Sequence, residues 1–332
     1  MSSLRLATFN LESLGDNSGA AAPLAERIAV LRPQLTRLDA DIVCLQEVDP
    51  EDVPGERRRA LVALDKLLAG TPYAGYERCV SRSPHGDYPA DRHNLVILSR
   101  FPVERSGQIH HDLVPPLRYP PVTAVPQPAP AIEARFDRPF LHAVVRLPGG
   151  QRIHVLNLHL KSPLAAAIPG QKRSAFVWNS VAGWAEGFFL SALKRAGQAL
   201  EVRLAVDRVF DAEPEAMVAV CGDFNADSWE VPVQIVRGAA EETQNTALAG
   251  RALTPLDMKV AKPRRYSVLH AGRALMLDHV LVSQNLATLA DEVDLSNEGL
   301  ADEVLSHPES RHPAESFHAA LCVEFDFSRR VG

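Results

Sequence analysis

The chain has 332 residues, of which 46% are hydrophobic, and its formal net charge is −6. This length and composition are sufficient to bury a large hydrophobic core. The acidic balance excludes the uniformly basic type of nucleic-acid-binding protein, although an acidic protein can still carry a local basic cleft.

No targeting or membrane-spanning segment is found in the sequence. The first residues, "MSSLRLATFN", lack a basic region followed by an apolar run, and no stretch of about 18 apolar residues occurs elsewhere. No Gly/Ser linker or charge run divides the chain. We therefore expect a cytoplasmic, monomeric protein with a single domain over residues 1–332.

The first hundred residues read as buried strands that alternate with amphipathic helices. A strand is predicted over Leu4–Asn10, and apolar residues at helical spacing predict a helix over Leu24–Leu38. "DIVCLQEV" (residues 41–48) predicts a second strand, Leu61–Leu68 a second helix, and Asn94–Arg100 a third strand. Each of these strands is short and almost wholly apolar, as expected for the core of a sheet.

Two segments in the middle of the chain are unusually long. Prolines are dense over residues 114–139, which excludes a helix or a central strand and indicates an ordered loop or edge ribbon. Residues 171–210 contain no proline and carry aromatic residues at helical spacing, which predicts a helical insert. That insert could serve core packing or cover one side of a binding site. Between the two segments, "FLHAVVRL" and "RIHVLNLHL" flank "PGG" and predict a hairpin.

The last strands complete a pattern in which strands outnumber crossover helices. They are "MVAVCGDFN", "ALMLDHVLVS" and "HAALCVEFDF". This pattern favours two mixed sheets packed face to face with helices outside, rather than a doubly wound parallel sheet.

Polar residues stand at the ends of six of the predicted strands. They are Asn10, Glu47, Asn157, His159, Asp223, Asn225, Asp278, His279 and His318. Residues two apart on a strand point the same way, so Asp223 and Asn225 share a side, as do Asn157 and His159. If these strand ends meet, their carboxylates repel one another unless a cation lies among them. Oxygen donors of this kind suit Mg²⁺ or Mn²⁺.

The same motifs resemble those of the endonuclease/exonuclease/phosphatase superfamily, which has a deoxyribonuclease I-like fold. They are "TFNLESL", "DIVCLQEVD", "NLVILSRFPV", "VLNLHLKS", "CGDFNAD", "MLDHVLVS" and "SFHA", and they follow in the superfamily's order. The resemblance implies a four-layered α/β/β/α sandwich and metal-assisted hydrolysis of phosphoesters. It does not indicate which branch of the superfamily applies.

The resemblance also implies roles for the residues that bind metal and substrate. Glu47 matches the metal-binding glutamate, and Asn10 matches the asparagine beside it, which supports the metal or the phosphate. His159 matches the histidine that contacts the scissile phosphate or helps to protonate the leaving group. Asn157, two residues earlier, is placed with it among the substrate-binding residues.

The remaining matches concern attack by water on the phosphate. Asp223 and Asn225 match the "DxN" pair that orients water and holds phosphate oxygens. Asp278 matches the aspartate that orients the catalytic histidine, and His318 matches that histidine, the general base. A histidine can accept a proton near neutral pH, and an aspartate on its other nitrogen fixes the tautomer.

One motif departs from the superfamily. Where members usually have "SDH", this chain has "SFH", so Phe317 replaces an aspartate that is often a metal ligand. Either Glu315 takes its place or the metal keeps more water. His312 is an alternative general base, which we place behind His318 because His318 continues into a predicted strand.

Several basic residues follow the motifs and leave two interpretations open. They are Lys161, Lys172, Arg173, Arg264 and Arg265, which could meet extra phosphate groups or be solvated surface charge.

The sequence therefore predicts a Mg²⁺- or Mn²⁺-dependent phosphoesterase and favours a phosphodiester as its substrate. The alternative is an inactive family member that binds phosphorylated ligands or proteins. DNA, RNA, lipid head groups and small phosphorylated metabolites all stay open as substrates, and the net charge does not favour nucleic acid.

Overall fold

Two six-stranded sheets form the centre of the protein. In the computed structural model, residues 2–15, 22–55, 58–306 and 314–329 are described. One sheet has the strand order β15-β16-β1-β2-β4-β3 and the other has the order β11-β14-β10-β9-β8-β5. Both are mixed, because β1–β2 and β9–β10 are parallel pairs while the other neighbours in each sheet run antiparallel.

The strands and helices have the following bounds. The strands of the first sheet are β1 (Ser3–Leu14), β2 (Ile42–Val48), β3 (Glu77–Val80), β4 (Asn94–Ser99), β15 (Ala290–Leu295) and β16 (Leu321–Asp326). Those of the second are β5 (Val103–Ile109), β8 (Phe140–Arg146), β9 (Arg152–His159), β10 (Met217–Asp223), β11 (Thr254–Pro255) and β14 (Asp278–Val282). Two small ribbons are β6 (Leu117–Tyr119) with β7 (Ile132–Ala134) and β12 (Val268–His270) with β13 (Arg273–Leu275). The helices are α1 (Leu24–Leu38), α2 (Val62–Leu68), α3 (Val181–Ala212), α4 (Val231–Arg237) and α5 (Gln284–Ala287).

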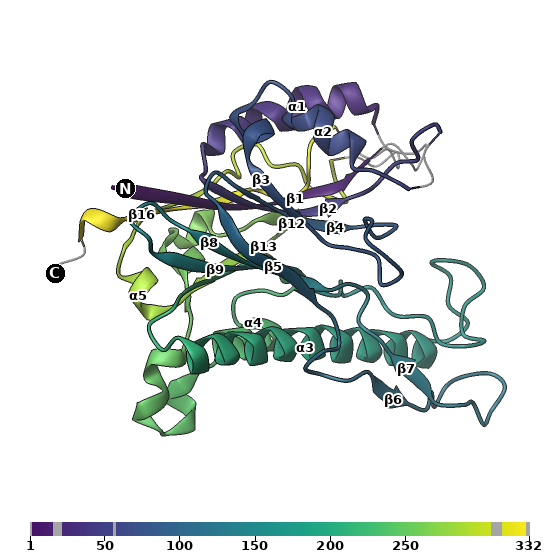
Figure 1. Cartoon of the computed structure of the whole chain (residues 1–332). Helices are drawn as coiled ribbons and strands as arrows, with labels where there is room; N and C mark the ends of the chain where they lie inside the picture. The colour runs from purple at the N-terminus through teal and green to yellow at the C-terminus, as the bar shows by residue number, and fades with distance from the viewer. Residues whose placement is uncertain (1, 16–21, 56–57, 307–313, 330–332) are drawn as a thin grey trace.

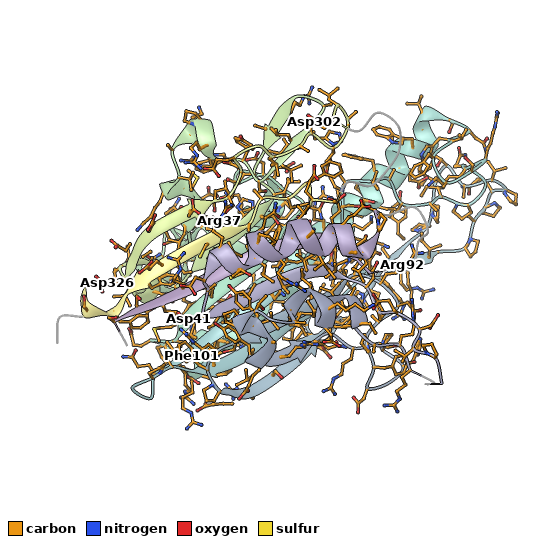
Figure 2. All side chains as sticks on the ribbon, turned by 90° about the horizontal axis from the view of Figure 1, so that it is seen from above. Arg37, Asp41, Arg92, Phe101, Asp302 and Asp326 are labelled. Atoms are coloured by element: carbon orange, nitrogen blue, oxygen red, sulfur yellow. The ribbon has the colours of Figure 1, made fainter. Side chains whose placement is uncertain are left out.

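The buried side chains divide into layers that follow from strand alternation. Side chains from the inner faces of both sheets, such as Leu6 and Val155, form one cluster between them. The outer face of the first sheet packs on α1 and α2, and that of the second packs on α3 and α4. Figure 1 shows these layers, and Figure 2 shows α1 lying across the first sheet, with Arg37 near its end. The predicted four-layered sandwich is confirmed.

The two parallel pairs determine where the polar strand ends gather. Because β1 and β2 are parallel, as are β9 and β10, the carboxyl ends of each pair lie at one edge of their sheet. The Gln46 side chain at the end of β2 donates to Asn157 Oδ1 at 2.7 Å near the end of β9, which brings the two edges together. We call this end of the sandwich the mouth.

The two long segments lie together. The Pro-rich segment contains the ribbon β6–β7, which lies beside one end of α3 (Figure 1). The C-terminal half of α3 packs on the second sheet through Val202, Val206 and Phe210. Its N-terminal half leaves Trp184 and Phe188 exposed and stacked on each other. No helix in the described part of the chain has both the length and the apolar character of a transmembrane helix.

Candidate active site

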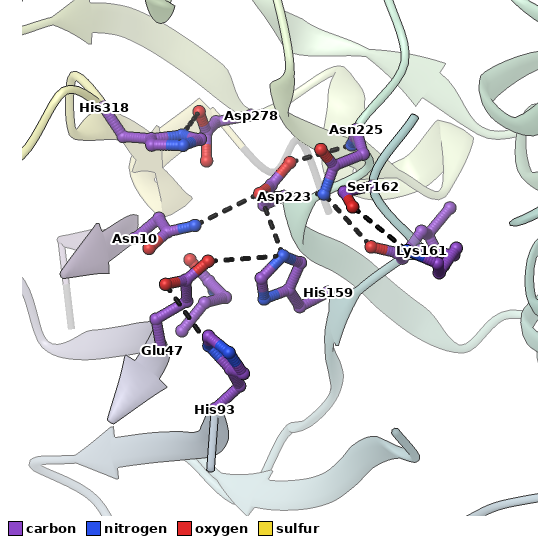
Figure 3. Close-up of polar contacts among 12 residues, drawn as sticks. Asn10, Glu47, His93, His159, Lys161, Ser162, Asp223, Asn225, Asp278 and His318 are labelled. Carbon is purple, nitrogen blue, oxygen red and sulfur yellow. Dashed lines mark hydrogen bonds and ion pairs between the residues drawn. The ribbon is translucent and has the colours of Figure 1, made fainter. Parts of the chain in front are cut away.

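Polar side chains from both sheets converge at the mouth. Figure 3 shows Asn10, Glu47, His93, His159, Asp223, Asn225, Asp278 and His318 facing one another. The register places Asp223 on β10 opposite His159 on β9 and opposite Asp278 on β14. One donor atom each from Asp223, Asp278 and His318 lie within 4.8 Å of one another. The strand ends singled out in the sequence therefore meet, with the exceptions described below.

Glu47 enters the mouth because β2 is irregular at its end. Strand alternation puts Gln46 between the sheets and would turn Glu47 toward the helices. Instead the register against β4 shifts between Leu45 and Val48, and Glu47 has a φ of 57°, so the bulge redirects its side chain. Its Oε2 accepts hydrogen bonds from the Ser13 backbone N–H and hydroxyl at 3.0 and 3.1 Å. Its Oε1 lies 3.7 Å from His159 Nε2.

Neighbouring cations also hold Glu47 in its ionised form. Burial opposes its charge, but His93, His159 and Arg138 outweigh this and hold the pKa of Glu47 well below its usual value. His93 Nδ1 lies 3.3 Å from Glu47 Oε2. Glu47 therefore presents one charged oxygen that the other contacts leave available to a ligand.

Glu12 is a second carboxylate of the mouth that the sequence reasoning missed. Its φ is 49°, at a register shift in β1 between Asn10 and Leu14. Its Oε2 accepts a hydrogen bond from the Phe317 backbone N–H at 2.7 Å. Burial, reinforced by Glu47, raises the pKa of Glu12 to about 7. No local pattern marked Glu12, because the irregular backbone and not regular alternation determines where its side chain lies.

Arg27 of α1 holds this irregular part of β1 in place. Its guanidinium donates to the backbone carbonyls of Leu11, Glu12 and Ser13 at 2.7, 2.8 and 3.2 Å, and the side chain is buried. Carbonyls that a bulge removes from the strand ladder need such donors when they are buried. The helix that covers the first sheet thus fixes the segment that carries Glu12.

Asp223 is held by amides on both sides. Its Oδ2 accepts from Asn10 Nδ2 at 3.1 Å and from Asn225 Nδ2 at 3.2 Å, and its Oδ1 accepts from the Asn225 backbone N–H at 2.8 Å. The Asn10 oxygen itself accepts the Glu12 backbone N–H at 2.8 Å, so Asn10 positions its neighbours. Gly222 precedes Asp223 with a φ of 137°, and a Cβ there would lie 2.0 Å from the Leu158 carbonyl oxygen. Burial raises the pKa of Asp223 to about 7.

His318 and Asp278 form a hydrogen-bonded pair. His318 Nδ1 lies 2.7 Å from Asp278 Oδ2, and the other oxygen of Asp278 is buried without a hydrogen-bond partner in the described residues. Burial alone would lower the pKa of His318, but Asp278, with Asp223 and Glu12 nearby, raises it well above its usual value. His318 lies just before β16, which starts at Leu321 rather than at His318 as the sequence suggested.

His159 lies between the carboxylates of the two sheets. Its Nε2 is 3.2 Å from Asp223 Oδ2, and its side chain is buried. Burial and the charge of Arg138 lower the pKa of His159 well below its usual value, so the ring is neutral. A neutral ring in this position can donate one N–H to an oxygen.

Asn157 lies deeper than a substrate can reach, so we no longer place it among substrate-binding residues. It is fully buried between the sheets. Its Nδ2 donates to the carbonyls of Leu45 and Val96 at 3.0 and 2.9 Å, and its Oδ1 accepts from Gln46. Asn157 and His159 lie on the same side of β9, as predicted, but only His159 reaches the mouth.

Replacing Asn157 with leucine should therefore reduce stability rather than substrate affinity. The change removes the side-chain donor to the buried carbonyls of Leu45 and Val96, and a buried polar group left unsatisfied costs about 1–3 kcal/mol. We expect the free energy of unfolding, measured by urea denaturation, to fall by at least about 3 kcal/mol. A KM that rises while stability stays unchanged would return Asn157 to the substrate site.

Arg138 is a cation of the mouth that the sequence did not reveal. It lies in "FDRPF", two residues before the start of β8, and its charge acts on Glu47 and Asp223. Burial lowers the pKa of Arg138. Its Nη1 is buried with no hydrogen-bond partner in the described residues. Its position within the Pro-rich insert gave no motif by which to find it.

The structure shows where the residues of the last motif lie. The Phe317 side chain is 7% exposed, and the Phe317 backbone N–H donates a hydrogen bond to the Glu12 carboxylate. Glu315 lines a cavity of about 230 Å³ between α1 and the 296–301 loop, which His318 also lines and Glu12 and Glu47 do not. His312 lies outside the described residues. His279 faces away from the mouth, with its Nδ1 3.2 Å from Asp257 Oδ1 and its Nε2 2.9 Å from the Ala226 carbonyl.

Comparisons with known proteins agree with this architecture. Residues 7–300 match the sequence profile described as the Endonuclease/Exonuclease/phosphatase family. No curated protein matches the chain in sequence.

Solved structures share the fold at low sequence identity. Humanized D. rerio TDP2 with 14 mutations is 16% identical with a TM-score of 0.58, and the match covers 98% of this chain and 100% of that one. The endonuclease/exonuclease/phosphatase from Bacteroides vulgatus is 16% identical with a TM-score of 0.57, over 98% and 99%. A variant of the 3′ phosphatase NExo from Neisseria, bound to a product DNA hairpin, is 18% identical with a TM-score of 0.51, over 98% and 100%.

Proposed function

The chain belongs to the Endonuclease/Exonuclease/phosphatase family, and we propose that it hydrolyses a phosphodiester with the help of Mg²⁺ or Mn²⁺. The observation that carries this proposal is the His318–Asp278 pair, 2.7 Å apart, among the carboxylates of Glu12, Glu47 and Asp223. A histidine–aspartate pair next to crowded carboxylates combines a general base with a cation site.

The residues of the mouth fit a hard divalent cation. Crowding and burial raise the pKa of Glu12 and Asp223 to about 7, as expected for carboxylates without a counter-ion. We propose that Glu47 and Glu12 hold the cation. Their oxygens are the donors that Mg²⁺ and Mn²⁺ prefer. When bound, such an ion neutralises negative charge on a phosphate oxygen as the transition state forms.

His318 then acts as the general base. Its Nδ1 bonds Asp278, so its Nε2 is left to accept a proton from water. Glu12 is one of the carboxylates that raise the pKa of His318, so a cation bound by Glu12 would favour the neutral ring that a base requires. Asp223, fixed by Asn10 and Asn225, accepts the other hydrogen bond of that water.

His159 and Arg138 bind the phosphate in this proposal. The single N–H of the neutral His159, at Nε2, faces Asp223 Oδ2 at 3.2 Å and is shared with a phosphate oxygen or the leaving group. Arg138 Nη1, which has no hydrogen-bond partner in the described residues, supplies a charge-assisted hydrogen bond to a non-bridging oxygen. A phosphate oxygen is a partner that this buried atom lacks within the described chain.

Changing Arg138 to methionine should mainly weaken substrate binding. A hydrogen bond to a charged group contributes about 1.5–3 kcal/mol, which corresponds to a loss of about 10- to 100-fold in kcat/KM. We expect the loss in steady-state kinetics to appear largely as a higher KM. Arg152→Met is the matched control, because Arg152 opens β9 at the end opposite His159. Equal effects of the two variants would remove Arg138 from the site.

A substrate screen with metal control tests the proposed function. Purified protein is assayed with bis-p-nitrophenyl phosphate, plasmid DNA, RNA, nucleotides and lipid head-group diesters, each with Mg²⁺, Mn²⁺ or EDTA. We expect hydrolysis of at least one diester that EDTA abolishes and added metal restores. Folded protein that hydrolyses none of them, yet binds phosphorylated compounds, would instead identify a binding member of the family.

A further inference from the structure

A cluster of cations lies beside the mouth, next to the proposed hydrolytic residues. Asp137 is shared by two lysines, with Lys194 Nζ 2.8 Å from its Oδ1 and Lys161 Nζ 3.7 Å from its Oδ2. Arg138 is the next residue, and its charge also acts on Lys161. Three cations and one carboxylate leave a local charge of +2, although the whole chain has a net charge of −6. Glu47 and Asp223 also act on Arg138, whereas the two lysines have Asp137 as their only ion-pair partner in the described residues.

The cluster is built on regular elements rather than on a free loop. Arg138 lies two residues before the start of β8, Lys161 lies two residues after the end of β9, and these two strands are antiparallel neighbours. The Lys161 backbone is fixed to α3, since its N–H donates to Gln198 Oε1 at 2.8 Å and its carbonyl accepts from Arg195 Nη1 at 3.0 Å. The long helix thus holds these cations in place.

The cluster adjoins the residues proposed to orient water. Asn225 Nδ2 donates to the carbonyl of Leu160, the residue before Lys161, at 3.0 Å. Lys161 Nζ donates to Ser162 Oγ at 3.1 Å, and Figure 3 shows both beside Asn225. An anion held here would therefore lie next to a phosphate bound between Arg138 and Asp223.

Limited exposure of the two lysines raises the free-energy cost of their unbalanced positive charge. The side chains of Lys161 and Lys194 are only 13% and 19% exposed. Burial lowers the pKa of Lys161, against the opposing effect of Asp137. Buried cations in excess over anions are costly unless a ligand completes the pairing.

We propose that Lys161, Lys194 and Ser162, together with Arg138, form a subsite for a second phosphate of the substrate, adjacent to the scissile phosphate. This inference rests on the proposed function. It narrows the substrate to a phosphodiester with another phosphate close by, as in a nucleic-acid strand or a phosphorylated small molecule. In the free protein Asp137 pairs with both lysines. When the phosphate is bound, the lysines contact both Asp137 and the phosphate.

Competition between matched mono- and bisphosphates tests the subsite. Hydrolysis of bis-p-nitrophenyl phosphate is measured with thymidine 5′-monophosphate or thymidine 3′,5′-bisphosphate as the inhibitor. The assay is repeated with fructose 6-phosphate or fructose 1,6-bisphosphate. We expect the bisphosphate of at least one pair to have a Ki at least about tenfold lower than its partner. A preference in the thymidine pair alone assigns the subsite to nucleic acid, and a preference in both pairs assigns it to phosphate itself.

Variants of the cluster should change this preference in opposite directions. The double variant Lys161→Gln/Lys194→Gln should abolish the preference, and Asp137→Asn should increase it because the competing carboxylate is gone. Lys66→Gln, on α2 in the opposite layer, should leave it unchanged. Equal Ki values in the wild type, or a preference that survives in the double variant, would overturn the subsite.

Calorimetry separates this inference from the proposed function. The same four compounds are titrated into the wild-type protein, which needs no turnover. A bisphosphate preference in a protein that hydrolyses no diester would support the subsite and reject the hydrolase. Turnover without any preference would reject the subsite and support the hydrolase.

Discussion

Replacing His318 with alanine is expected to lower kcat for a phosphodiester by about 10²- to 10⁴-fold, which is the typical contribution of a general base. The only strong side-chain contact of His318 in the described residues is with Asp278, so the variant should unfold at nearly the wild-type temperature. Steady-state kinetics with bis-p-nitrophenyl phosphate and thermal unfolding measure both quantities. Asp278→Asn should reduce kcat as well, because it no longer holds the ring in the required tautomer.

His279 offers a matched control for this prediction. It is adjacent to Asp278 in sequence but is fully buried on the other face of β14, paired with Asp257. His279→Ala should therefore reduce stability, with little effect on kcat in the folded fraction. If His312→Ala abolished turnover while His318→Ala did not, the general base would have been assigned to the wrong histidine.

Replacing Glu47 or Glu12 with glutamine is expected to weaken Mg²⁺ binding on the order of 10- to 100-fold. The amide preserves the shape of the side chain but removes the charge that holds a hard cation. Isothermal titration with Mg²⁺ and with Mn²⁺ measures the effect without turnover, and high metal concentrations should partly restore activity. The Glu47 variant should show the larger loss, because Glu47 is the more strongly ionised of the two.

Glu315→Gln is the control that decides how the missing aspartate is replaced. Glu315 lines the cavity beside α1, so its change should leave the metal titration unaltered. If Glu315→Gln weakened Mg²⁺ binding and Glu12→Gln did not, the carboxylate that replaces the missing aspartate would be Glu315 and not Glu12.

The sequence predicted the layers and the main strand ends because these depend on local patterns. Continuous apolar runs and helical spacing marked β2, β9, β10 and α1, and the bounds predicted for α1 agree with the structure. Strand alternation also placed Asp223 and His159 on sides that face the mouth. Strands with mostly exposed residues, such as β5, carried no such pattern and were missed.

Residues that depend on irregular backbone or on distant segments could not be found in this way. Glu47 was identified by its motif, whereas strict alternation would have turned it toward the helices, and only the bulge explains its position. The position of Glu12 depends on a hydrogen bond from the Phe317 backbone N–H, which no sequence pattern reveals. Arg138 belongs to the Pro-rich insert, whose path to the mouth is set by packing against α3 rather than by local sequence.

A crystal structure of the protein with Mn²⁺ and phosphate would test the central claim most directly, because anomalous scattering locates the ion. We predict one ion bound by oxygens of Glu47 and Glu12 with several waters, and a phosphate between that ion, Arg138 and His159. His318 should keep its hydrogen bond to Asp278. An ion bound instead by Asp223, Asp278 and His318, with Glu12 and Glu47 turned away, would contradict both the metal assignment and the role of His318 as the base.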